Sequence, residues 1–86
     1  MQLAAESTKP LVTRMKRAHG HLATVIRMLE EGADCEDVLT QLAAVNKALS
    51  RAGFAIVASG MEQCLSEGDL DGSQRLRMEK LFLSLA

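Results

Sequence analysis

Two cysteines are the residues of this 86-residue chain best suited to chemistry. Cys35 and Cys64 lie 29 positions apart, and each is surrounded by helix-forming residues. A cysteine sulfur can act as a soft metal ligand or a redox-active thiolate, or it can simply fill space as a small buried hydrophobe. Spacing alone leaves all three alternatives open.

The distance between the two sulfurs depends on the element that carries them. On one continuous helix, a rise of about 1.5 Å per residue would separate Cys35 from Cys64 by roughly 43 Å, whereas a disulfide needs Cα atoms within about 7 Å. The pair therefore cannot bond within one chain. In an antiparallel dimer, Cys35 of one copy can lie beside Cys64 of the other, which would create two symmetric sites.

The remaining candidate groups give weaker signals. His19 and His21 are two positions apart, so they point to different sides of a helix, and neither has a cysteine within one turn. The chain has no phosphate-binding glycine loop, no paired-carboxylate site and no nucleophile with a matching base. We therefore predict that the protein is not an enzyme and needs no cofactor.

Apolar residues near the N-terminus recur three and four positions apart, which is the pattern of one helix face. They are Leu11, Met15, Ala18, Leu22, Val25 and Leu29. The pattern predicts a helix over residues 9–31, with Ser7 or Thr8 as its N-cap and Gly32 at its end. Residues 1–8 are then expected to form a flexible N-terminal tail.

A longer stripe follows with the same alternation, and it predicts a second helix. Its members are Cys35, Val38, Leu42, Val45, Leu49, Ala52 and Ile56. Asp34 suits the N-cap of this helix, Gly68 its latest end, and a third helix should begin near Gly72. We predict an all-α fold in which residues 9–86 form a single helical domain of three helices.

The two long apolar stripes exceed what one chain can cover. An antiparallel dimer of the hairpins, forming a four-helix bundle, would bury them. A bundle that serves only as a dimerisation or interaction module, without DNA binding, would show the same repeat.

Charge is distributed unevenly, although the net charge is only −1. Residues 7–29 carry five basic side chains and no acid, and residues 30–37 carry five acids and no base. The basic stretch can attract a polyanion or be a solvated helix face. The chain contains no apolar run long enough to span a bilayer and no secretory signal, so we expect a cytoplasmic protein.

Two segments resemble the copper-sensitive operon repressor (CsoR) family, which includes nickel-, formaldehyde- and persulfide-sensing members. They are RMKRAHG at residues 14–20 and MLEEGADCEDVLTQLAAV at residues 28–45, and the resemblance extends over residues 10–66 without a gap. It implies a bacterial transcriptional repressor built as an antiparallel dimer that pairs again into a tetramer, a dimer of dimers. It also implies binding to operator DNA and release when an inducer reacts at the cysteines.

The resemblance also implies DNA-binding residues. Arg14 and Arg51 match family positions implicated in DNA contact, and Lys16 and Arg17 follow closely after the first of them. Lys47 lies one helical turn before Arg51 and is assigned to the same basic face. Such cations can follow the phosphate backbone and release its counterions.

The inducer depends on where this chain departs from the family. Copper-sensing members place a histidine four residues before the second cysteine, where this chain has Gly60. The nickel- and formaldehyde-sensing ligand patterns are also absent. A cysteine pair without imidazole resembles the persulfide-responsive branch, the CsoR-like sulfurtransferase repressors. We therefore expect reactive sulfur species to modify the Cys35/Cys64 pair between subunits, with entry through the space at Gly60.

Copper is the alternative inducer. Cu(I) accepts soft sulfur ligands, so Cys35 and Cys64 could bind it as two thiolates without the family histidine.

Overall fold

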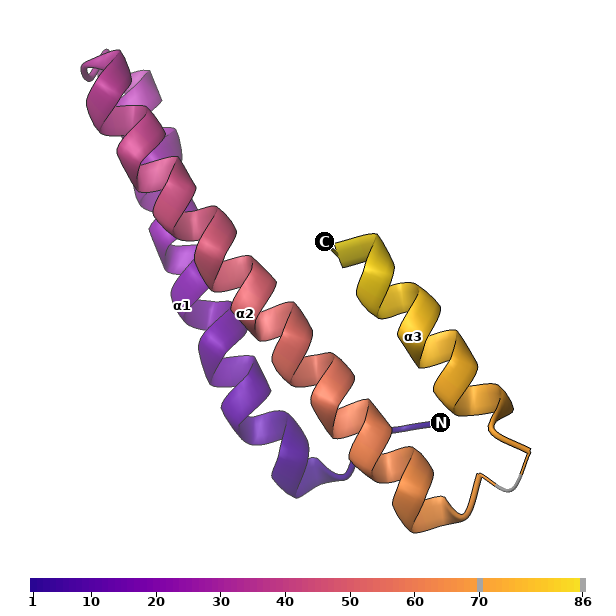
Figure 1. The fold of residues 1–86 in the computed structure, drawn as a ribbon. Helices are drawn as coiled ribbons and strands as arrows, with labels where there is room; N and C mark the ends of the chain where they lie inside the picture. The colour runs from indigo at the N-terminus through magenta and orange to yellow at the C-terminus, as the bar shows by residue number, and fades with distance from the viewer. Residues whose placement is uncertain (70, 86) are drawn as a thin grey trace.

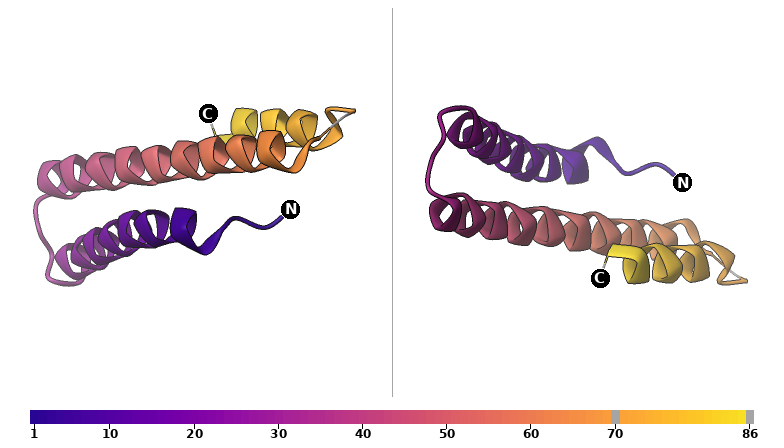
Figure 2. Two further views of the ribbon diagram at one scale, coloured as in Figure 1. Left: turned by 90° about the horizontal axis from the view of Figure 1, so that it is seen from below. Right: turned by 90° about the horizontal axis from the view of Figure 1, so that it is seen from above.

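The computed structural model describes residues 1–69 and 71–85, which form three helices and no strand. They are α1 (Ala5–Glu30), α2 (Cys35–Glu67) and α3 (Ser73–Leu85). α1 and α2 form an antiparallel hairpin, and α3 folds back along the second half of α2 (Figure 1). The two further views put α1 and α3 on different sides of α2 (Figure 2). The prediction of three helices is confirmed.

None of these helices, over the residues described, has an apolar stretch long enough to cross a membrane.

α1 begins earlier than predicted. Its N-cap is Ala4, which makes no side-chain capping bond, so the predicted cap at Ser7 or Thr8 is wrong. The Thr8 hydroxyl instead donates to the carbonyl of Ala5 within the first turn (2.9 Å). Residues 5–8 of the expected tail are therefore helical, and Pro10 lies inside the helix, where it cannot donate a backbone hydrogen bond.

The ends of the long helices follow the expected cap residues. Gly32 has a φ of +72° after α1, and the N–H of Ala33 donates to the carbonyl of Met28 (2.9 Å). Asp34 caps α2, because its carboxylate accepts the N–H of Glu36 (3.0 Å). Gly68 ends α2 with a φ of +70°. The predicted roles of these three residues are confirmed.

The hairpin fully buries only three residues of each predicted apolar stripe. Its buried seam consists of residues one heptad apart on each helix: Leu11, Ala18 and Val25 on α1, and Val38, Val45 and Ala52 on α2. The alternate members of the α1 stripe stay accessible, with Met15 41% exposed, Leu22 37% and Leu29 62%. One chain therefore has a second apolar edge that it does not cover.

α3 packs closely on α2 at two glycines. A Cβ atom built on Gly53 would lie 3.0 Å from Cδ1 of Leu85, and one built on Gly60 would lie 2.6 Å from Cε of Met78. Between these positions, the rings of Phe54 and Phe82 have centroids 5.2 Å apart. The missing glycine side chains let the helices approach closely, although α3 itself has no fully buried residue among those described.

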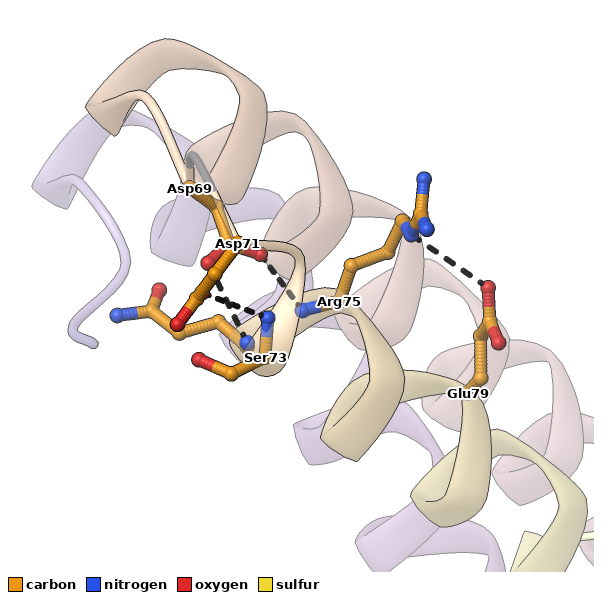
Figure 3. Close-up of polar contacts among 6 residues, drawn as sticks. Asp69, Asp71, Ser73, Arg75 and Glu79 are labelled. Atoms are coloured by element: carbon orange, nitrogen blue, oxygen red, sulfur yellow. Dashed lines mark hydrogen bonds and ion pairs between the residues drawn. The ribbon is translucent and has the colours of Figure 1, made fainter.

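Two aspartates hold the start of α3 (Figure 3). Asp69 accepts the backbone N–H of Arg75 (2.9 Å), and Asp71 accepts that of Ser73 (3.0 Å). The hydrogen bond from the Ser73 backbone lowers the pKa of Asp71. Arg75 also forms an ion pair with Glu79 at 3.8 Å. The hydrogen bonds of Asp69 and Asp71 thus fix the direction in which α3 leaves the turn.

The Asp34 cap gives a first prediction. Asp34→Ala should lower the free energy of unfolding by about 1 kcal/mol, because the N–H of Glu36 loses its acceptor. Asp34→Asn keeps an acceptor oxygen and should retain most of the stability. Urea unfolding followed by circular dichroism measures the free energy of unfolding of both variants. An equal loss of stability in Asp34→Ala and Asp34→Asn would contradict the capping role.

Candidate functional site

Cys64 lies buried in the last full turn of α2, with only 2% of its surface exposed. Its Sγ atom is 3.6 Å from Sδ of Met1 and 3.7 Å from Oε1 of Gln74. The single S–H can donate to only one of these acceptors at a time. The N-terminal segment runs back past this end of α2, which brings Met1 to the thiol (Figure 1).

A cavity of about 390 Å³ borders the same thiol at the turn between α2 and α3. Its lining consists of Met61, Cys64, Leu65, Gly68, Asp69, Gly72 and Arg75. The cavity wall is mainly apolar, with polar groups at the turn. A small ligand or a side chain from another molecule can therefore reach the vicinity of Cys64 from this side.

The expected open space at Gly60 does not exist. A Cβ atom built on this glycine would lie 2.6 Å from the methyl carbon of Met78 and 3.7 Å from that of Met1. Both side chains occupy the volume that the absent side chain leaves. The expectation that this space admits a sulfur donor is therefore wrong, because methionine side chains fill it.

Cys35 lies exposed at the first residue of α2, at the opposite end of the helix from Cys64. Because α2 is continuous, the two thiols of one chain are roughly 43 Å apart. Within residues 1–69 and 71–85, no three side chains of His, Cys, Asp or Glu gather as a ligand set. A single chain therefore cannot bring its two thiols to one ion.

The surroundings of Cys64 nevertheless suit a soft ion. Among the described residues, the hydrogen-bond partners of the thiol are a thioether sulfur and an amide oxygen, and the Asp69 carboxylate is on the lining of the adjoining cavity. Cu(I) prefers thiolate and thioether donors. The donor set thus fits Cu(I), provided that a second thiol comes from another chain.

Three of the predicted DNA-binding residues lie along one edge of the hairpin. His21 on α1 bonds Gln41 on α2 across this edge (2.7 Å). Arg14 and Arg17 precede His21 by seven and four residues, so they share its helix face, and both are exposed. Arg51 on α2 is also exposed. Around the axis of α2 it lies about a quarter of a turn from Gln41, on the side away from the seam. We call these three arginines the basic edge.

The other two predicted residues, Lys16 and Lys47, differ in their placement. Lys16 lines a pocket with Val12, Met15 and His19 on the apolar side of α1, away from the basic edge. Lys47 is exposed one turn before Arg51, so the two side chains are neighbours on α2 and Lys47 lies beside the basic edge. Of the five predicted cations, Lys16 is the one that lies away from this edge.

Sequence reasoning missed the groups around Cys64. Met1 and Met78 lie 63 and 14 residues from Cys64 in the sequence, and no periodic pattern links either of them to it. The one available signal was the spacing of Gly60 and Cys64, which share a helix face one turn apart. A glycine there indicates that another side chain approaches.

Comparison with known proteins gives consistent matches along most of the chain. A Mycobacterium ulcerans protein named copper-sensing transcriptional repressor CsoR is 38% identical over 77 residues, which cover 90% of this chain and 66% of that protein. The chain thus spans slightly less than two thirds of that relative. Bacillus subtilis YrkD is 48% identical over 58 residues, covering 67% of this chain and 92% of YrkD.

A solved structure also matches over the full length. The nickel-responsive transcriptional regulator InrS has a TM-score of 0.73 and 27% identity, with 100% of this chain and 97% of InrS covered. The family model described as metal-sensitive transcriptional repressor matches residues 7–83. A family of repressors agrees with the expectation of a non-enzyme, and these matches give the persulfide-responsive branch no support. The chain belongs to the metal-sensitive transcriptional repressors, the family that includes CsoR.

Proposed function

We propose that this protein is a Cu(I)-responsive repressor that binds operator DNA and releases it when Cu(I) binds between subunits. The observation that carries the proposal is the buried Cys64 thiol, set 3.6 Å from a thioether sulfur, in a chain 38% identical to a copper sensor. Cu(I) replaces reactive sulfur as the leading inducer, because relatives that match most of this chain are named copper-sensing. In addition, methionines fill the space at Gly60 through which a sulfur donor was expected to enter.

The apolar edge of the hairpin supports an antiparallel dimer. Met15, Leu22 and Ile26 lie on the opposite flank of α1 from the basic edge, and they are 37–50% exposed. On α2, Leu39 and Leu49 remain 57% and 39% exposed. Burying these side chains against a second copy would complete a four-helix bundle. A tetramer made of two such dimers follows from the family resemblance.

An antiparallel partner also resolves the thiol geometry. The start of α2 in one subunit would then lie near the end of α2 in the other. Cys35 of the partner subunit could approach the cavity beside Cys64 and supply the second thiolate. Two copies of the site would form in each dimer, related by its twofold axis.

The basic edge supports DNA contact. Arg14, Arg17 and Arg51 lie on the side of the hairpin away from the apolar edge, so dimerisation would leave them free for phosphate. Among the residues that the structure describes, none of the three forms an ion pair with an acid. Cu(I), when bound, supplies a bond that holds two subunits together at the ends of α2. A shift of α2 at that link would change the spacing between the basic edges.

The inducer is tested by measuring operator release. Cu(I) added anaerobically to the reduced repressor should lower its affinity for DNA upstream of its gene cluster by about 5- to 150-fold, the usual range of coupling between sites. Cys64→Ser and Cys35→Ser should abolish the response, and Ser66→Ala, an exposed change two residues from Cys64, should preserve it. Release by polysulfide but not by Cu(I) would restore the persulfide interpretation.

The intersubunit pairing is tested by crosslinking. Mild oxidation with diamide should produce covalent dimers of the wild-type protein, because the two thiols of one chain are too far apart to join. Mass spectrometry should find one peptide pair, containing Cys35 and Cys64. The Cys35→Ser and Cys64→Ser variants should each lose this crosslink. If either variant still formed covalent dimers at the wild-type level, the crosslinks would come from random collisions and the pairing would be contradicted.

The DNA-binding edge is tested by its salt dependence. Arg14→Ala combined with Arg51→Ala should weaken operator binding and reduce the slope of log affinity against log salt by about 0.9 for each phosphate that is no longer neutralised. Lys80→Ala on α3 is the control and should leave the slope unchanged. Undiminished binding by the double variant, or binding insensitive to ionic strength, would rule out this edge as the DNA-binding surface.

A further inference from the structure

Three sulfur-containing side chains from separate parts of the chain meet near the end of α2. They are Met1 from the N-terminal segment, Cys64 from α2 and Met78 from α3. We propose that the thioether sulfurs of Met1 and Met78 are ligands of the Cu(I) ion held by Cys64. This inference rests on the proposed copper response and extends the site beyond its two thiols.

The distance between Met1 and Cys64 already suits a shared ion. Metal–sulfur bonds of about 2.3 Å separate two sulfurs on one ion by roughly 3.7 to 4.0 Å, in tetrahedral or trigonal geometry. The distance from Sγ of Cys64 to Sδ of Met1 is 3.6 Å. The two atoms therefore need almost no movement to bind the same ion.

Met78 reaches the site through the gap at Gly60. Its Sδ atom lies 3.4 Å from the position of a Cβ atom built on that glycine. Gly60 precedes Cys64 by one turn, and Cβ positions at this spacing are about 5 to 6 Å apart on one helix face. The sulfur of Met78 therefore lies about one helical turn from the Cys64 position, and its unbranched side chain has three rotatable bonds with which to approach the thiolate.

The donor chemistry favours Cu(I) over harder ions. Thioethers are neutral, soft donors, and soft sulfur ligands select Cu(I). With Cys35 of the partner subunit, Met1, Cys64 and Met78 would give a site made entirely of sulfur. The thioethers would then replace the imidazole that the resemblance expects at Gly60. They would also connect α3 directly to the ion.

Selenium gives a direct test of this site. The full-length protein is prepared with selenomethionine, loaded with Cu(I), and measured by X-ray absorption at the copper edge. We expect a copper–selenium scattering shell in the wild type. Met78→Leu should reduce the shell, and adding Met1→Leu, made behind a cleavable tag, should remove it. Met28→Leu is the matched control, because Met28 packs against the core of the hairpin, and this variant should retain the full shell.

Affinity provides the second measurement. In competition with a chromophoric Cu(I) chelator, the double variant should bind Cu(I) about 10- to 100-fold more weakly than the wild type, the range typical for loss of a supporting group in a metal site. Leu conserves the volume of Met, and circular dichroism checks that each variant is folded.

The outcomes separate the two proposals. Tight Cu(I) binding without a selenium shell, or a shell unchanged in the double variant, overturns the thioether site and leaves the copper response standing. A wild-type protein that cannot compete for Cu(I) at all overturns both.

Discussion

The continuity of α2 is the constraint on which the rest of the molecule depends. A helix that runs from Cys35 to Glu67 keeps the two thiols of a chain roughly 43 Å apart. Any chemistry that uses both thiols must therefore join two molecules. In the proposed dimer, the subunit contact that covers the apolar edge would also complete the site, so sensing would depend on assembly.

The hairpin carries an apolar flank and a basic flank. Three residues of each apolar stripe close the seam between α1 and α2, and Met15, Leu22 and Leu49 stay accessible on one flank. The basic edge occupies the opposite flank, next to the bond between His21 and Gln41. A partner hairpin and a DNA backbone can thus contact the same pair of helices without competing for surface.

The periodic and local features of this fold could be predicted from sequence. Alternating apolar positions predicted the helices, and Gly32, Asp34 and Gly68 predicted their ends, because caps act over a few residues. The start of α1 was misjudged, since Ala4 leaves no capping signature and Pro10 resembles a first-turn residue. Membership of the family could also be predicted, whereas the inducer could not be inferred from the missing histidine.

The surroundings of Cys64 could not be predicted for a different reason. Met1 reaches the thiol only because the N-terminal segment crosses the end of α2, and Met78 reaches Gly60, one turn from the thiol, only because α3 folds back. Contacts between residues so distant in the sequence leave no periodic pattern. Gly60 gave a misleading signal, because a missing side chain looks like empty space until the chain that fills it is located.

The capped turn before α3 anchors the helix at its N-terminal end only. Asp69 and Asp71 anchor its first residues, Met78 lies roughly 8 Å along its axis from Ser73, and Leu85 lies roughly 18 Å along it. Any pivoting about the anchored end displaces Leu85 about twice as far as Met78. A displacement of Met78 at Gly60 would therefore be about doubled at Leu85, which packs against Gly53 in the middle of α2, two residues from Arg51.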